Sequence, residues 1–206
     1  MAKFDTERLK ERVRERLSER RFRHTLGVCE LATFLADGIV PNMRDEVYCA
    51  AMLHDVAKEL PIEEQLKLID RVRISEEDLK TPSVYHAFAA VSAILRDFPE
   101  YATENVLSAV FNHTTGAPDM SLFDCIIFVS DFAEAGREYP SCLEVRKKLL
   151  TYIAEAKTLE EKRFALFKAT YDTANATIEA LSRMQKKINS RTLLTKNAFE
   201  AKIKHI

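Results

Sequence analysis

The chain has 206 residues, of which 47% are hydrophobic and 31% are charged, and its formal net charge is −1. This length and composition are typical of one globular domain with a substantial core. A net charge near zero provides no overall field to attract nucleic acid or an anionic membrane, so we expect neither DNA nor a membrane as a partner. Basic residues gather between Arg12 and Arg23, but acidic residues alternate with them, which is typical of a solvated helix face.

The cysteines and the N-terminus indicate a reducing compartment. The four cysteines are widely spaced and form no CxxC pair, so we expect small buried side chains rather than disulfides. They are Cys29, Cys49, Cys125 and Cys142. The highly charged N-terminus lacks the apolar core of a signal peptide, and no apolar segment is long enough to span a bilayer. These features predict a cytoplasmic protein.

The scarcity of glycine favours a helical protein. The chain has 4 glycines, whereas average usage predicts about fourteen. Apolar residues at near-helical spacing predict a first amphipathic helix over residues 4–17. A second helix is predicted from about 22 to 36 and a third from 45 to 59. Gly38 follows the second and Pro61 follows the third, and both residue types are helix stop signals. Residues 62–71 predict a short fourth helix, and Ser75 with the three acids after it has the pattern of another helix start.

The second half of the chain continues the helical pattern. Pro82 introduces a helix that carries His86 and ends before Pro99. Further helices are predicted over residues 104–113, 121–135, 140–156 and 159–188, and a short helix is expected to close the chain. The chain shows no internal repeat or linker. We therefore predict an all-α fold over residues 1–206 as a single domain, with a C-terminal helical extension from about residue 159.

Six residues combine imidazole or carboxylate groups with apolar surroundings. They are His24, His54, Asp55, His86, His113 and Asp131, which include four of the five histidines. An ionisable side chain within an apolar helix is costly unless it is paired, and a metal cation offsets that cost. Nitrogen and carboxylate ligands together suit one or two transition-metal ions. A lone histidine is more often an ordinary core or surface residue, so the interpretation depends on the whole ordered set.

The adjacency of His54 and Asp55 suggests how the ligands are divided. Neighbours on a helix point about 100° apart, so the pair can grip one ion from two directions or let Asp55 bridge two ions. We expect His24 and Asp131 to complete a first site, and the two remaining histidines to supply a second. Two ions about 4 Å apart would hold a bridging hydroxide, which is a nucleophile at neutral pH.

Cationic and hydroxyl side chains lie close to these ligands in the sequence. Arg21 and Lys58 each lie about one helical turn from a predicted ligand, a spacing that favours contacts with phosphate. Thr114 follows His113 where a helix breaks, and it fits a phosphate contact and a simple turn equally well. Glu134 lies one turn beyond Asp131, where it either orients a ligand or pairs with Arg137.

The ordered set and its local sequences resemble a known family. His24, His54-Asp55 and Asp131 match the H…HD…D pattern of the HD-domain metal-dependent phosphohydrolases. The segments 21–28 (RFRHTLGV), 53–58 (LHDVAK), 113–116 (HTTG) and 130–137 (SDFAEAGR) are more specific. They resemble the YqeK branch, the symmetrical bis(5'-nucleosyl)-tetraphosphatases, over residues 9–188. Ala135 stands where that branch commonly has proline.

This resemblance implies an HD-domain helical bundle that hydrolyses diadenosine tetraphosphate symmetrically into two ADP. It implies one or two iron ions, with manganese or zinc as alternatives. The implied metal ligands are His24, His54, Asp55, His86, His113 and Asp131. The implied catalytic residues are Asp55, Lys58, His86 and His113. The implied substrate contacts are Arg21, Lys58, His86, His113, Thr114 and Arg137.

Other functions fit the same residues. Within the family, the alternatives are another nucleotidase or a phosphodiesterase that acts on a cyclic nucleotide. Outside enzymes, the alternative is a non-catalytic nucleotide-binding regulator. The sequence leaves the metal, the exact nucleotide and a homodimeric state open.

Overall fold

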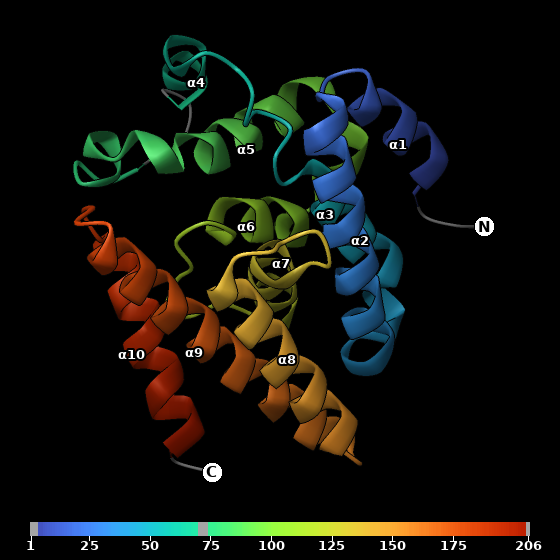
Figure 1. Cartoon of the computed structure of the whole chain (residues 1–206). Coiled ribbons are helices and arrows are strands. Elements are labelled where there is room, and N and C mark those ends of the chain that lie inside the picture. Colours follow the sequence, from blue (N-terminus) through green and yellow to red (C-terminus); the bar gives the residue numbers. More distant parts are fainter. Residues whose placement is uncertain (1–3, 70–73, 205–206) are drawn as a thin grey trace.

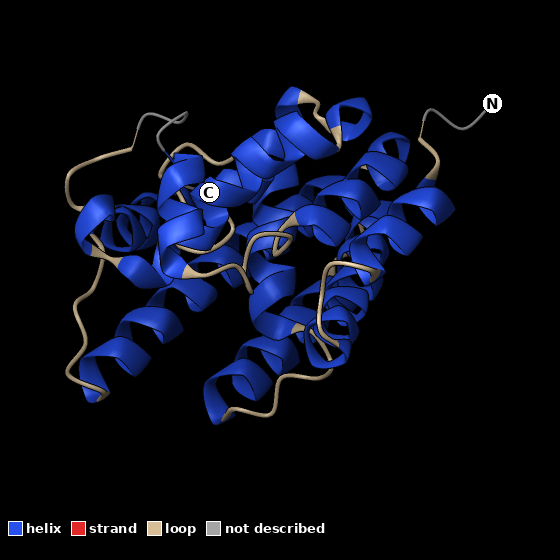
Figure 2. Cartoon of the chain, turned by 90° about the horizontal axis from the view of Figure 1, so that it is seen from above, coloured by secondary structure: helices blue, strands red, loops and turns tan. Residues whose placement is uncertain are grey.

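The protein is all-α, as the glycine count and the apolar spacing predict. In the computed structural model, which describes residues 4–69 and 74–204, these residues form helices, turns and loops but no strand (Figures 1 and 2). The α-helices are α1 (Thr6–Arg14), α2 (Glu19–Ile39), α3 (Arg44–Leu53), α4 (Ile62–Ile69), α5 (Tyr85–Asp97), α6 (Glu104–Asn112), α7 (Leu122–Ala133), α8 (Pro140–Glu155), α9 (Leu159–Arg183) and α10 (Ser190–Lys204). Single 3-10 turns are η1 (Pro41–Met43), η2 (Asp78–Lys80), η3 (Pro82–Val84) and η4 (Pro99–Tyr101).

Side-chain caps determine where several helices begin. The Ser121 side chain accepts a hydrogen bond from the backbone N–H of Asp124, and the Asp124 carboxylate accepts one from the Ser121 N–H, which makes a capping box at the start of α7. Thr158 and Glu161 form the same arrangement at the start of α9. Such caps satisfy backbone N–H groups that have no partner within the helix. The predicted starts near residues 121 and 159 are thereby confirmed.

The third helix is shorter than predicted, and the difference matters for the site. The sequence predicts a helix over 45–59, but α3 ends at Leu53 and residues 54–59 form successive turns. The Nδ1 of His54 lies 2.6 Å from the carbonyl oxygen of Ala51. This carbonyl is one of the last four of the helix and has no intrahelical partner there, so the His54 side chain satisfies it. His54 and Asp55 therefore lie beyond the end of α3 and are not adjacent residues within a helix.

The prediction of a helix start at Ser75 is only partly right. The Ser75 hydroxyl does accept the N–H of Asp78, as a cap should. The segment that follows is the single turn η2, because Pro82 starts a new turn four residues later. The predicted helix over 62–71 begins at Ile62 as expected, and its end lies outside the described residues.

The C-terminal helices also differ from the prediction. α9 ends at Arg183 rather than at 188, because Gln185 adopts a left-handed φ of 52°. The N–H of Lys186 then donates to the carbonyl of Leu181, and that of Gln185 donates to Ser182. This is a Schellman end made without glycine, so the sequence carries no signal for it. The closing helix, expected to be short, is the 15-residue α10.

The core forms around α7, which packs against α2, α3, α6 and α9 (Figure 1). Ile126, Ile127 and Val129 of α7 are fully buried. α8, α9 and α10 lie side by side at the C-terminal end, where Phe167 and Phe199 pack with ring centroids 5.6 Å apart. The division into one domain with an extension from about residue 159 stays a prediction.

Two further expectations concern the surface and the thiols. Among the described residues, no helix is both long and apolar enough to cross a membrane. All four cysteines are buried and free, as the sequence predicts. Burial raises the pKa of the Cys49 thiol to about 12, so this thiol is protonated at neutral pH.

Candidate metal centre

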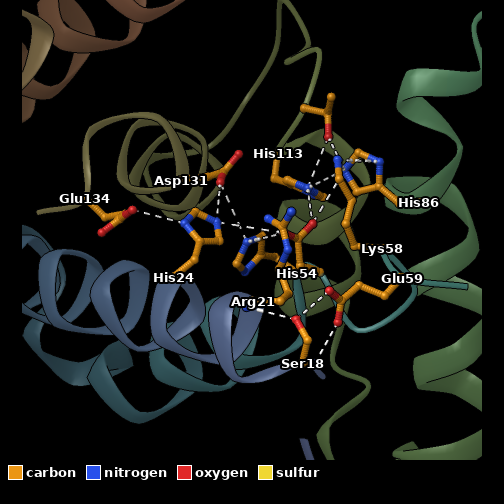
Figure 3. Close-up of polar contacts among 12 residues, drawn as sticks. Ser18, Arg21, His24, His54, Lys58, Glu59, His86, His113, Asp131 and Glu134 are labelled. Carbon is orange, nitrogen blue, oxygen red and sulfur yellow. Dashed lines mark hydrogen bonds and ion pairs between the residues drawn. The ribbon is translucent and has the colours of Figure 1, made fainter. Parts of the chain in front are cut away.

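The structure brings the six candidate ligands together from five separate helices or helix ends (Figure 3). His24 lies in α2, His54 and Asp55 directly follow α3, His86 lies in the first turn of α5, His113 directly follows α6, and Asp131 lies in the last turn of α7. The side chains therefore converge although they are separated by up to 107 positions in the chain. Their roles as ligands stay predictions.

The first group of donors faces one oxygen of Asp55. One ligand atom from each of His24, His54 and Asp55 lies within 4.8 Å of the others. The Oδ2 of Asp55 is 3.8 Å from the Nε2 of His24 and 3.5 Å from that of His54. The Oδ1 of Asp131 joins the same group, at 3.0 Å from His24 Nε2 and 3.7 Å from His54 Nε2.

The second group faces the other oxygen of the same carboxylate. The Oδ1 of Asp55 lies 3.6 Å from the Nε2 of His86 and 3.7 Å from that of His113. Asp55 therefore belongs to both groups, with one oxygen turned toward each. The Thr114 hydroxyl lies 3.0 Å from the Nε2 of His86 and 3.1 Å from the Nε2 of His113. This threonine thus contacts the second group and does not merely form a turn.

The hydrogen bonds of the imidazoles test whether a metal ion fits. The Nδ1 atoms of His54 and His113 lie 2.6 and 2.7 Å from the backbone carbonyls of Ala51 and Val110. A carbonyl only accepts, so Nδ1 carries the proton and the lone pair of each Nε2 faces Asp55. The Nε2 of His54 is buried and has no hydrogen-bond partner within residues 4–69 and 74–204. Lone pairs facing a carboxylate at these distances need a cation between them, so the donors could hold one or two metal ions.

His24 is oriented by a carboxylate instead of a carbonyl. Its Nδ1 lies 3.1 Å from the Oε1 of Glu134, on the side of the ring opposite Asp131. Burial alone lowers the pKa of His24, but the hydrogen bonds with Asp131 and Glu134 outweigh it and raise the pKa to about 9. Of the two interpretations of Glu134, the structure agrees with contact to the predicted ligand His24.

Electrostatics favours an ionised Asp55 carboxylate and a neutral His86 imidazole. Burial alone raises the pKa of Asp55, but its interactions with the imidazoles of His54, His113 and His86 hold it well below its usual value. Burial and the charge of Lys58 hold the pKa of His86 well below its usual value. Burial also lowers the pKa of Lys58. The His86 imidazole is therefore uncharged at neutral pH, and one of its two ring nitrogens keeps a lone pair.

Three cationic side chains surround the two groups, as the sequence predicts. The Nη1 of Arg21 lies 2.7 Å from the Oδ2 of Asp55, and the Nη2 of Arg137 lies 2.8 Å from the Oδ1 of Asp131. The Nζ of Lys58 lies 3.0 and 3.1 Å from the two ring nitrogens of His86. Each cation thus contacts a predicted metal ligand directly.

The structure also reveals supporting residues that the sequence does not indicate. The Arg146 guanidinium donates to the backbone carbonyls of Ala133, Glu134 and Arg137, which holds the turn that follows α7. The Glu59 carboxylate accepts from the hydroxyl and the N–H of Ser18, which ties the turn after α3 to the start of α2. Nothing in the spacing of these residues distinguishes them from ordinary surface side chains.

Comparison with known proteins identifies the family. The sequence profile of the HD domain matches residues 21–136, which contain all six candidate ligands. The chain belongs to the HD domain family. Its relatives include the symmetrical bis(5'-nucleosyl)-tetraphosphatase of Bacillus subtilis, at 33% identity over 145 residues, covering 70% of this chain and 77% of that protein.

Two further comparisons agree with this HD assignment. The symmetrical bis(5'-nucleosyl)-tetraphosphatase of Halalkalibacterium halodurans is 35% identical over 141 residues, covering 68% of this chain and 74% of the relative. A solved structure of an HD superfamily hydrolase from Clostridium acetobutylicum, described as involved in NAD metabolism, superposes with a TM-score of 0.80. It is 26% identical and covers 97% of this chain and 98% of its own.

Proposed function

We propose that this HD-domain protein hydrolyses diadenosine tetraphosphate symmetrically into two molecules of ADP. The observation that carries the proposal is the pair of donor groups that share Asp55, with Arg21, Lys58 and Arg137 around them. Metal-dependent hydrolysis of a polyphosphate needs cation sites next to donors for phosphate oxygens. The relatives named as symmetrical tetraphosphatases support the choice of substrate.

The arginine side chains supply the phosphate contacts. The Nε of Arg21 is buried without a hydrogen-bond partner among the described residues, although its Nη1 contacts Asp55. A buried donor without a partner is costly, and a phosphate oxygen would satisfy it. Arg137, about 31% exposed, lies at the edge of the same site and can donate to a phosphate from the solvent side.

The ligand set fits iron, and the same imidazole and carboxylate groups also accept manganese or zinc. The groups His24, His54, Asp55 and Asp131, and Asp55, His86 and His113, would each hold one ion. When bound, the ions lower the pKa of a water molecule and provide a nucleophile at neutral pH. Asp55 would contribute to both ions, because it belongs to both groups.

The reaction breaks the anhydride link at the centre of the tetraphosphate. The oxygen of one water molecule forms a bond to one of the two inner phosphorus atoms. The bond from that phosphorus to the central bridging oxygen breaks, and the second ADP leaves. Lys58, next to His86, stabilises the charge that develops on the leaving phosphate. Thr114 donates its hydroxyl to a phosphate oxygen beside His113.

Product analysis tests the proposal directly. The purified protein is first assayed for bound metals by elemental analysis. It is then supplied with iron(II) or manganese and incubated with diadenosine tetraphosphate in water enriched in oxygen-18, and the nucleotides are separated by chromatography. We expect ADP alone, with one labelled oxygen in half of the ADP molecules.

Other products would overturn the proposal. AMP together with ATP would indicate cleavage of an outer anhydride link instead of the central one. Turnover only with a mononucleotide or a cyclic nucleotide would indicate another HD-type hydrolase. Stoichiometric metal without turnover of any nucleotide would indicate a binding protein.

A further inference from the structure

We infer that Glu134, held against Gly27, is a positioning residue that fixes the imidazole of His24 as a metal ligand. The inference rests on the metal dependence in the proposed function. Glu134 is not itself a member of either donor group, because its carboxylate contacts Nδ1 of His24, on the side of the ring away from Asp131. It therefore acts through His24 and not on the substrate.

The Glu134 carboxylate is held from several sides. Its side chain is buried, with 3% of the residue exposed. Oε1 lies 3.1 Å from His24 Nδ1, and Oε2 accepts the backbone N–H of Gly136. Arg146 donates to the backbone carbonyls of Glu134, Ala133 and Arg137. Both the backbone and the carboxylate of this residue are thus restrained.

Gly27 makes this position accessible to the carboxylate. A Cβ atom added at Gly27 would lie 2.4 Å from Glu134 Oε2 and 3.2 Å from its Cδ. These distances are shorter than van der Waals contact, so any side chain at residue 27 displaces the carboxylate. Gly27 lies within α2, where glycine is about 1 kcal/mol less favourable than alanine. The close approach of Glu134 gives a physical reason for glycine at this position.

The carboxylate selects the tautomer of His24. An ionised carboxylate only accepts hydrogen bonds, so it requires the proton on Nδ1 and leaves the Nε2 lone pair for a metal ion. In Glu134→Gln, the amide oxygen keeps the N–H of Gly136 as its partner, and the amide NH₂ then faces Nδ1. That arrangement requires a lone pair on Nδ1 and places the proton on Nε2, where it blocks the metal. The variant keeps the shape of the side chain but reverses the tautomer.

Cobalt(II) binding to the full chain provides a test that does not depend on turnover. Affinity is measured by titration with a competing chelator, and the visible absorption of the bound cobalt reports its ligands. We expect Glu134→Gln to bind cobalt at the first group about 10- to 100-fold more weakly than wild type, the range typical of such supporting residues. Wild-type affinity and an unchanged cobalt spectrum in this variant would overturn the inference.

Gly27→Ala tests the same contact without removing a polar group. The atom that must move is the end of a flexible side chain, so we expect the variant to fold and to bind cobalt more weakly. Gly38→Ala is the matched control on the same helix, because its Cβ would meet, in the part of the chain that the structure describes, only the Lys162 side chain at 3.6 Å. We expect Gly38→Ala to bind cobalt like wild type.

A double-mutant cycle shows whether Gly27 acts through Glu134. In a Glu134→Ala background no carboxylate remains to be displaced, so Gly27→Ala should weaken cobalt binding no further. An equal additional loss in that background would overturn the link between the two residues. Normal cobalt binding by wild type without hydrolysis of diadenosine tetraphosphate would overturn the proposed function alone.

Discussion

Replacing Asp55 by Asn tests the central feature of the site, a carboxylate shared by two groups of donors. Asp55 is 2% exposed, and its two oxygens lie 3.5–3.8 Å from four imidazole Nε2 atoms. In the variant, the amide oxygen accepts from Arg21 in place of Oδ2. The amide NH₂ then takes the place of Oδ1 and faces His86 and His113. An amide nitrogen has no lone pair for a metal, so the second group loses a ligand and both groups lose a negative charge.

The expected loss of activity is large, whereas the expected loss of stability is modest. Metal ions contribute several kcal/mol to the stabilisation of transition-state charge, and about 4 kcal/mol corresponds to a factor of about 10³ in rate. The hydrogen bond between Arg21 and Asp55, 2.7 Å long, loses the charge of its acceptor and becomes one between a guanidinium and a neutral amide oxygen. This change costs about 1–2 kcal/mol, which lowers the melting temperature of a chain of this length by roughly 2–8 °C.

The assay compares turnover of diadenosine tetraphosphate by wild type and Asp55→Asn at saturating manganese, with melting followed by circular dichroism. Asp172→Asn is a control, because Asp172 is also largely buried and pairs with a cation, Lys148, at 3.3 Å, outside the site. We expect the control to keep wild-type turnover. Turnover by Asp55→Asn within tenfold of wild type would refute the bridging role.

Three further predictions concern other residues. Lys58→Ala should lower kcat about 10²- to 10³-fold with a smaller change in KM, and an unchanged kcat in steady-state assays would contradict its role at the leaving phosphate. In metal-free protein, His24 has a folded pKa of about 9, above its ordinary 6.5, so its stabilising effect is complete below pH 6.5 and is lost as the pH rises through 9. Melting temperatures from pH 6 to 10 should fall in that window for wild type and not for His24→Gln. Gly116→Ala should lower the melting temperature by roughly 4–8 °C, because φ is +71° and an added Cβ would lie 2.6 Å from the Thr195 hydroxyl. The left-handed backbone and this close contact together cost about 2 kcal/mol of stability. An unchanged melting temperature would contradict this account.

Much of the local structure follows from the sequence alone. The few glycines and the apolar spacing are sufficient to predict an all-α chain, and capping residues such as Ser121 mark helix starts correctly. The end of α9 was predicted wrongly, because a left-handed Gln185 replaces the usual glycine. The end of α3 was also wrong, because a histidine side chain takes up a helix carbonyl there.

The sequence by itself determined which donors this protein has and that they lie in or directly beside apolar helical segments, because side-chain chemistry and hydrophobic period are properties of short segments. Only the tertiary structure decided which oxygen of Asp55 faces which histidines. The same holds for the contact of Glu134 with His24, 110 positions away, and its close approach to Gly27. These contacts join residues on different helices, and their distances depend on how α2 packs against α7 and the turn that follows it. Helix packing at that precision is set by all the buried side chains together, and no single motif encodes it.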